Sequence, residues 1–408
     1  MVGSQDRYTH GNSMNQKTWF RIVFCMLACT SSLGLAQNIT GRPNLDAEQA
    51  SSMFLVSSSI PYQFPESREA SPESLSAIEV ARLASDRCGI ANAIQSNIKA
   101  EATSPKREHQ ENSCSDVLFR TLQNAIACRQ RQTAAASAWK IHYGIAACLL
   151  ATKILDETEA ILREQLQAQL ALVDRGVPIP DPLLVDRLKT SVSDKRLEND
   201  SKISTLRMQL SALIGPECAC NHSPREDDTL VPSDVAVCEH IDQAMRCRCD
   251  LVSLRSVRGT IREESLEDWN TIASFLGGTP IFSKRSPFLW KLFRTKQSQN
   301  DIQRAIGARR SWLDKITSER TKQVTMEVEL AFERKRTAAL RWVNAGEQTQ
   351  NWEERIRQLE KLSEVQGNLA QQFEAKLNRL QSRAQQLERW VDWHQAQADL
   401  ILATGDNL

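Results

Sequence analysis

Cysteine and histidine are the residues of this chain best suited to chemistry, and several lie close together in the middle of the sequence. The segments CACNH, CEH and CRC hold the candidates for a metal site, which are Cys218, Cys220, His222, Cys238 and His240, followed by Cys247 and Cys249. Thiolates and imidazoles suit zinc, but Cys-x-Cys spacing is less typical than Cys-x-x-Cys, and the helical phase of 238–249 directs some side chains apart. We therefore expect no metal and no cofactor, with these cysteines in disulfides or as free buried thiols.

The common catalytic motifs are absent from the sequence. It contains no Gly-x-Ser-x-Gly, no phosphate-binding glycine loop and no His-Glu-x-x-His. Asp156, Glu157, Glu159 and Glu164 cluster among basic neighbours on a long helical stretch, which is typical of a solvated face. The net charge of +1 lacks the basic surplus that nucleic acid requires. We predict a protein that is not an enzyme and has no nucleic-acid partner.

The N-terminal residues have the pattern of an export signal. Lys17 and Arg21 precede an apolar run at 22–28, and small residues follow at Gly34 and Ala36. This order predicts a signal peptide over residues 1–36, cleaved before Gln37. The odd number of cysteines beyond it is consistent with disulfides and a leftover thiol in an exported chain.

Two long helical runs come next, separated by the segment DRGVPIPDP at 174–182. Residues 115–175 contain no proline, and their apolar residues recur at steps of three and four, which is the period of a helix. Glycine and three prolines then stop the helix. A second run begins at Leu183 or Leu184 and ends at Gly215. The pattern is that of a long helical hairpin.

The last third of the chain repeats this plan. A helical run starts near Asp301, breaks at Gly367 and resumes, so that Leu400 and Gly405 follow Leu210 and Gly215 at an offset of 190. The segments RCGI at 87–90 and RCDL at 248–251 form a second pair of matching positions. Such spacing indicates an internal duplication. Two tryptophans on the final run, at 390 and 393, are expected to pack rather than to bind a ligand.

These patterns predict an all-α fold of two tandem, long, antiparallel helical hairpins of the coiled-coil, α-barrel type, with little or no β-structure. The predicted parts are a signal peptide at 1–36, an N-terminal segment with a short helix at 37–114, a first hairpin at 115–215, a joint with a short helix and a variable apolar stretch at 216–300, and a second hairpin at 301–408.

The order of these segments resembles the TolC family of outer-membrane efflux factors. The resemblance rests on ALVDRGVPIPDPLLVDRL at the first turn, on the hairpin ends QLSALIG and LILATG, on SERTKQVTMEVELAF at 318–332, and on EHIDQAMRCRCDL at 239–251. In the third of these segments the matching residues are Arg320, Val324, Glu327, Val328, Ala331 and Phe332. In the last segment, Cys249 stands where the family has proline.

This resemblance implies a homotrimer whose hairpins build a hollow helical barrel, acting as a passive exit duct of an efflux or secretion system. It implies export to the outer membrane or periplasm of a Gram-negative-type bacterium, and partnership with a periplasmic adaptor and an inner-membrane pump. The docking tip would then be the first turn, which comprises Gly176, Val177, Pro178, Ile179, Pro180 and Asp181.

The segments where the family carries membrane strands differ in this chain. Residues 101–112 are short and polar, and residues 260–299 lack the alternation of transmembrane strands. Phe288, Trp290 and Phe293 lie among basic residues, so they are candidates for a membrane-interface anchor, although a loop packed on the helices is favoured. The alternative function is therefore a periplasmic coiled-coil scaffold or adaptor that has lost its membrane strands.

Overall fold

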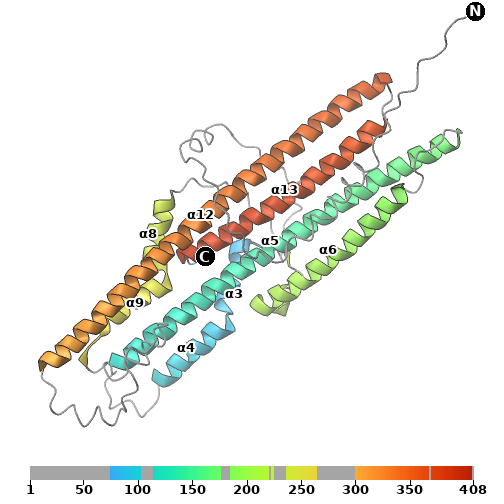
Figure 1. Ribbon diagram of the computed structural model, residues 1–408. Coiled ribbons are helices and arrows are strands. Elements are labelled where there is room, and N and C mark those ends of the chain that lie inside the picture. The colour runs from blue at the N-terminus through green and yellow to red at the C-terminus, as the bar shows by residue number, and fades with distance from the viewer. Residues whose placement is uncertain are drawn as a thin grey trace, which may run out of the picture. The chain divides into compact units, whose positions relative to one another are not determined.

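A computed structural model describes residues 74–102, 114–175, 184–219, 222–224, 236–263, 299–366 and 369–406 (Figure 1). Its helices are α3 (Ala77–Asp86), α4 (Gly89–Ala102), α5 (Cys114–Val173), α6 (Leu184–Ile214), α7 (Pro216–Ala219), α8 (Val237–Cys247), α9 (Cys249–Thr260), α12 (Gln299–Gln366) and α13 (Leu369–Thr404). Two short strands, β1 (Ser74–Leu75) and β2 (Ser223–Pro224), pair in parallel, with Ser74 opposite Ser223. The predicted all-α fold with little β-structure is confirmed.

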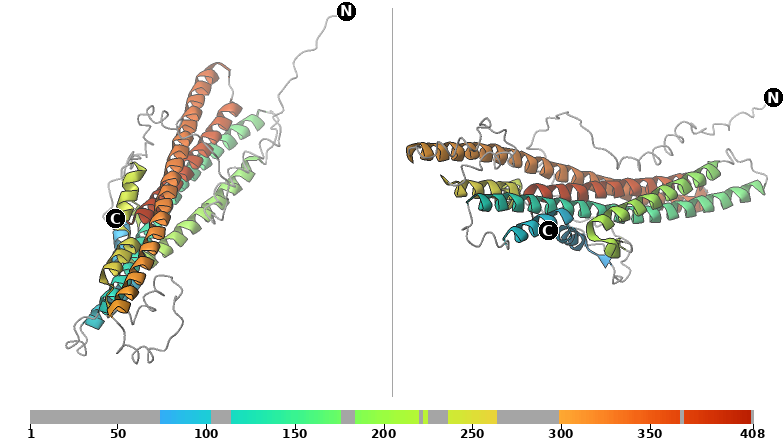
Figure 2. Two further views of the ribbon diagram at one scale, coloured as in Figure 1. Left: turned by 60° about the vertical axis from the view of Figure 1, so that its left-hand side comes forward. Right: turned by 90° about the horizontal axis from the view of Figure 1, so that it is seen from below.

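The two long hairpins are antiparallel, as expected. In the first hairpin, the Asn199 amide donates to the Thr152 hydroxyl at 2.9 Å, and Arg196 pairs with Asp156. A later residue of α5 is thus paired with an earlier residue of α6, so the two helices run in opposite directions. In the second, the Thr349 and Ser382 hydroxyls lie 3.0 Å apart and join α12 to α13. Figure 2 shows the members of each hairpin side by side.

The described residues divide into two compact units. The first contains the hairpin segments nearest the turns, at 151–175, 184–200, 345–366 and 369–386, and we call it the turn unit. The second contains the short helices and the remaining hairpin segments, at 74–102, 114–150, 201–219, 222–224, 236–263, 299–344 and 387–406, and we call it the body unit.

The turn unit is a four-helix arrangement held by small apolar clusters and by ion pairs. Leu162 and Val185 pack with Phe373 and Leu377, which joins α5 and α6 to α13. Glu157 on α5 accepts from Arg379 at 3.3 Å and from Arg383 at 2.5 Å on α13. The carboxylates expected on a solvated face therefore also link neighbouring helices.

The body unit packs the short helices against the long ones in two equivalent ways. In the first copy, Val80 and Ala84 of α3 contact Ala138 of α5. In the second copy, Ala244 of α8 contacts Val328 of α12, which lies 190 residues after Ala138. The duplication predicted from the sequence is thus repeated in the core.

The hairpin ends are capped alike in both copies. Gly215 and Gly405 have φ angles of 89° and 71°, in the left-handed region that favours glycine. Arg87 donates to the carbonyl of Ile214, and Arg248 donates to that of Ala403 at 3.2 Å. A Cβ on Gly215 would lie 2.7 Å from the Arg87 guanidinium, and one on Gly405 would lie 2.9 Å from Arg248 Cγ. Both glycines are therefore favoured by the backbone angle, and at Gly405 the Arg248 backbone, 3.0 Å from such a Cβ, also leaves no space for a side chain.

Candidate functional site

The cysteines and histidines singled out in the sequence occupy separate places in the structure. Cys249 is bonded to Cys128, His222 contacts another histidine, and His240 packs 5.8 Å from Phe332 between ring centres. Cys218 is partly buried and Cys238 is exposed, both as free thiols, while Cys220 lies outside the described residues. Within the described ranges, no three His, Cys, Asp or Glu side chains gather as metal ligands.

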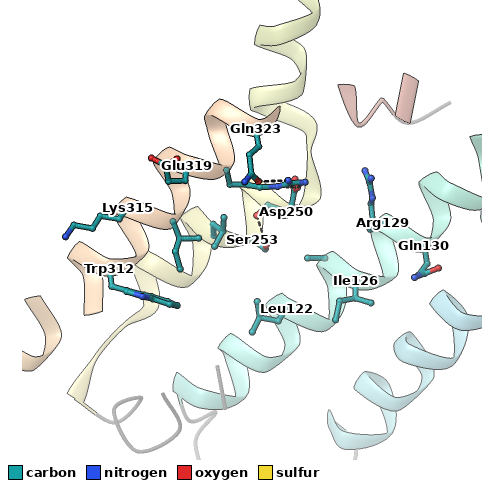
Figure 3. A pocket seen from close by; sticks show the side chains of 14 residues that line it. Leu122, Ile126, Arg129, Gln130, Asp250, Ser253, Trp312, Lys315, Glu319 and Gln323 are labelled. Atoms are coloured by element: carbon teal, nitrogen blue, oxygen red, sulfur yellow. Dashed lines mark hydrogen bonds and ion pairs between the residues drawn. The ribbon is translucent and has the colours of Figure 1, made fainter. Parts of the chain in front are cut away.

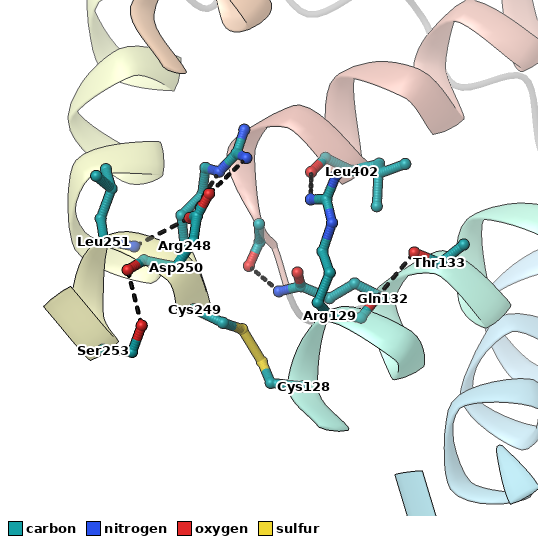
Figure 4. Close-up of a disulfide and its surroundings, with 11 residues drawn as sticks. Cys128, Arg129, Gln132, Thr133, Arg248, Cys249, Asp250, Leu251, Ser253 and Leu402 are labelled. Carbon is teal, nitrogen blue, oxygen red and sulfur yellow. Dashed lines mark hydrogen bonds and ion pairs between the residues drawn. A yellow bond between two sulfur atoms is a disulfide. The ribbon is translucent and has the colours of Figure 1, made fainter. Parts of the chain in front are cut away.

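A disulfide joins the two copies of the repeat. Cys128 on α5 and Cys249 at the start of α9 are bonded across 121 residues of sequence, with their Cα atoms 6.3 Å apart (Figure 4). The sequence predicted disulfides without assigning partners, because nothing local connects these two positions. Next to the bond, Gln132 on α5 donates to the Gly405 carbonyl at 2.9 Å, so the first copy also caps the end of the second hairpin.

Beside the disulfide, two arginines and two carboxylates form a network. Arg248 donates to Asp250 at 2.9 Å and pairs with Glu327, and Arg320 donates to Asp250 at 2.8 Å and to Glu327 at 3.1 Å. Burial would raise the pKa of Asp250, but the hydrogen bonds and charge of Arg248 and Arg320 outweigh it and lower this pKa. The charges of the two arginines and the two carboxylates compensate one another, as the burial of Arg248 requires.

The stretch at 318–332 owes its residue types to this network and to the adjoining core. Arg320 and Glu327 supply the charges described above. Val324 and Val328 are fully buried and Ala331 is 6% exposed, all against α8 and α9. This part of the resemblance therefore reflects the packing of α12 on the short helices.

A second cluster brings three buried histidines together among aromatic rings. His142 Nδ1 on α5 lies 3.1 Å from His222 Nε2, and His394 on α13 stacks on Tyr143 with ring centres 3.5 Å apart. These histidines are between 0% and 3% exposed. Trp390 meets Tyr143 edge to face, in keeping with the packing role expected of the final tryptophans.

Burial keeps these imidazoles neutral. It lowers the pKa of His142 and of His394 to about 3 and that of His222 to about 4. A general acid or base works best with a pKa near the ambient pH, so these histidines are poor proton-transfer groups at neutrality. The sequence singled out His222 but missed His142 and His394, whose burial follows only from the packing of α5 against α13.

The predicted docking tip at 176–181 and the predicted interface residues Phe288, Trp290 and Phe293 lie outside the described residues. The structure therefore leaves both as predictions. Among the helices that it describes, none has the length and apolar character needed to cross a membrane.

The comparisons with known proteins bear on the fold. No protein-family model matches the sequence, and no curated protein matches it. Among solved structures, the chain is similar to the CmeC outer membrane channel of Campylobacter jejuni, with a TM-score of 0.58 and 10% identity over 91% of this chain and 94% of that chain.

Two further channels have comparable scores. The open state of the MtrE outer membrane channel of Neisseria gonorrhoeae matches with a TM-score of 0.52 and 10% identity over 81% of this chain and 88% of that chain. The outer membrane protein VceC of Vibrio cholerae matches with a TM-score of 0.51 and 13% identity over 72% of this chain and 74% of that chain. At these identities the likeness establishes the fold: the chain has the helical architecture of TolC-like outer-membrane channels, which confirms the resemblance at that level.

Proposed function

We propose that this chain is the exit-duct component of an efflux or secretion system, exported to the outer membrane or periplasm and assembled as a homotrimer. The observation that carries the proposal is the duplicated frame of two long hairpins with capped ends, in the same fold as three outer-membrane channels. A duct needs walls rather than a reaction centre. The networks described above hold helices together.

The packing of α9 supports assembly from repeated units. Leu251, Leu254 and Val257 of α9 are buried. Leu254 and Val257 share a core with Leu118 and Leu122 of α5, so the long helix of the first copy covers the short helix of the second. The short helix α9 thus contacts a long helix of the other repeat.

The equivalent face of α4 is open. Ile90, Ala93 and Ser96 stand 161 residues before the three buried positions of α9, and all three are exposed, Ile90 by 60%. An exposed isoleucine at a position that is buried in the other copy indicates a contact still to be made. The α12 helix of a second copy of the chain would cover this face in the way that α5 covers α9, and the repetition of that contact would close a ring.

A cysteine cross-link tests this assembly. At the repeat offsets, the Cys128–Cys249 bond maps onto Ser318 of one chain and the free thiol Cys88 of the next. Ser318→Cys, in a background where the exposed Cys238 and Cys247 are serine, is expected to give disulfide-linked dimers and trimers on non-reducing gels. Gln303→Cys is the matched control, because Gln303 is also exposed and lies about 22 Å from Ser318 toward the N-terminus of α12. Equal cross-linking at 303 and 318, or none at 318, would refute the arrangement.

Fractionation distinguishes the duct from the alternative scaffold. A duct is expected in the outer-membrane fraction as a detergent-extracted trimer, and it should restore drug efflux in a host that lacks its own channel. A soluble periplasmic species that restores no efflux would support the scaffold. Conduction is refuted if this species still forms the cross-link between Ser318→Cys and Cys88, because the assembly is then intact but does not conduct.

A further inference from the structure

A cavity of about 700 Å³ lies in the body unit between α5, α9 and α12 (Figure 3). Its size falls within the range of sites for drug-sized molecules. The three helices that form it come from both copies of the repeat, and the Cys128–Cys249 bond ties two of them together close by. The cavity is therefore part of the fixed junction between the copies.

The inner wall of the cavity is apolar. It is lined by Leu122 and Ile126 of α5, by Leu254 of α9, which shares a core cluster with Leu122, and by Trp312 of α12. Leu122 and Leu254 are each 5% exposed, whereas Ile126 is 40% exposed, so the wall runs from the core toward solvent. Such a surface suits an apolar ligand body.

The charged groups around the cavity are unequally paired. Arg320 and Asp250 belong to the compensated network, and Glu319 pairs with Lys322 at 2.8 Å. Arg129, in contrast, reaches only the carbonyl of Leu402, at 3.4 Å, and it forms no ion pair with any residue that the structure describes. Arg129, Arg248 and Arg320 thus share the two carboxylates of Asp250 and Glu327, which leaves one positive charge in excess.

The surroundings of Arg129 make it receptive to an anion. Burial and the nearby charges of Arg248 and Arg320 lower the pKa of its guanidinium, and they outweigh Asp250 and Glu327, which act to raise it. Lys315 on α12 adds a second positive charge to the lining. A bound anion would accept charge-assisted hydrogen bonds from Arg129, which are stronger than bonds between neutral groups.

We propose that this cavity binds an amphiphilic monoanion, such as a long-chain carboxylate. The carboxylate lies against Arg129, and the hydrocarbon body packs along Leu122, Ile126 and Trp312. This assignment rests on the cavity, its apolar wall and its unbalanced cation, and it holds whether or not the assembled protein conducts.

Titration calorimetry of the full chain with dodecanoate below its micellar concentration tests the proposal, with dodecanol and dodecyltrimethylammonium as neutral and cationic probes. We expect saturable binding of dodecanoate, weaker binding of dodecanol, and the weakest binding of the cation. Arg129→Met keeps an apolar side chain and removes the charge, so it is expected to weaken dodecanoate binding by about tenfold or more and to leave dodecanol unchanged.

Two further variants separate binding in the cavity from general surface effects. Arg304→Met removes a cation on α12 whose side chain is 81% exposed, and it should bind dodecanoate as the native chain does. Ala125→Phe places a ring in the cavity lining and should block both dodecanoate and dodecanol, with folding checked by circular dichroism. The proposal is overturned by absent saturable binding, by equal binding of cation and anion, or by Arg129→Met binding as Arg304→Met does.

Discussion

The buried histidine cluster predicts that the folded chain loses stability steeply in mild acid. His142, His222 and His394 are neutral in the fold but take up protons near pH 6.5 once unfolded. Because their pKa values are lowered in the folded chain, their contribution to the stability of the fold is fully present above pH 6.5. It is lost progressively as the pH falls toward the folded values of about 3 and 4.

The size of the loss follows from linkage. Between pH 7.5 and pH 5, each histidine that protonates only in the unfolded chain costs about 2 kcal/mol, so the three cost about 6 kcal/mol. Glu388 acts in the opposite direction. Burial raises its pKa to about 7, so its contribution grows as the pH falls from 7 toward 4.5 and offsets part of the loss. Over the same pH range Glu388 returns about 2.4 kcal/mol, so the net loss is about 3.5 kcal/mol. This is a large fraction of the roughly 5–15 kcal/mol by which typical domains are stable.

Urea unfolding followed by circular dichroism at steps of half a pH unit gives the slope of the free energy of unfolding against pH. The His394→Phe variant isolates the contribution of one histidine to this slope. Phenylalanine preserves the stacking on Tyr143 and removes His394 Nδ1, a buried atom without a hydrogen-bond partner among the described residues. The slope near pH 5.5 should fall by about 1.2 kcal/mol per pH unit, whatever the variant's stability at pH 7. An unchanged slope would show that His394 titrates normally in the fold and would refute the account.

Three other outcomes are expected. Cys128→Ser removes the bond between the copies and should lower the free energy of unfolding by about 3–5 kcal/mol, measured by urea denaturation against the native chain with and without reductant. Gly405→Ala should lower the free energy of unfolding by about 1–3 kcal/mol, because Gly405 has a positive φ and lies close to Arg248. Gly307→Ala, in a helix with open space around it, should raise it by about 0.5–1 kcal/mol. Thermal melts of both variants measure the difference. Replacing Val177 and Ile179 with Asp should leave the melting temperature unchanged and abolish adaptor binding in a pull-down; unchanged binding would leave this segment as a turn only.

The long helices were predictable because their signals are local. An apolar residue at every third or fourth position, with proline and glycine at the ends, predicted helices over 115–175 and from 183 or 184 to Gly215. The structure has them at 114–173 and 184–214. The offset of 190 between Gly215 and Gly405 likewise needed only a comparison of the sequence with itself. Periodicity and repetition are properties of the linear chain, so they do not depend on how its helices pack.

The contacts around α9 could not be predicted in this way. Cys249 and Cys128 are 121 residues apart, and the rotation of α5 about its own axis decides which of its side chains faces α9. The same holds for His142 and His222, whose contact depends on the path of the chain after α7. Spacing within a cluster such as CACNH carries no information about a partner on a distant helix.

The junction between α8 and α9 shows how contacts from distant helices can hold a turn. Cys249 stands where the resembling family has proline, and in the structure it is the first residue of α9, with Arg248 as the extended residue before it. Proline suits that position because it fixes the backbone angle of the first helical turn and forgoes a hydrogen bond that the helix does not make. Cysteine lacks this preorganisation. Here a covalent bond to Cys128 and the arginine network hold the junction through contacts with distant parts of the chain, and the bond also joins the two copies.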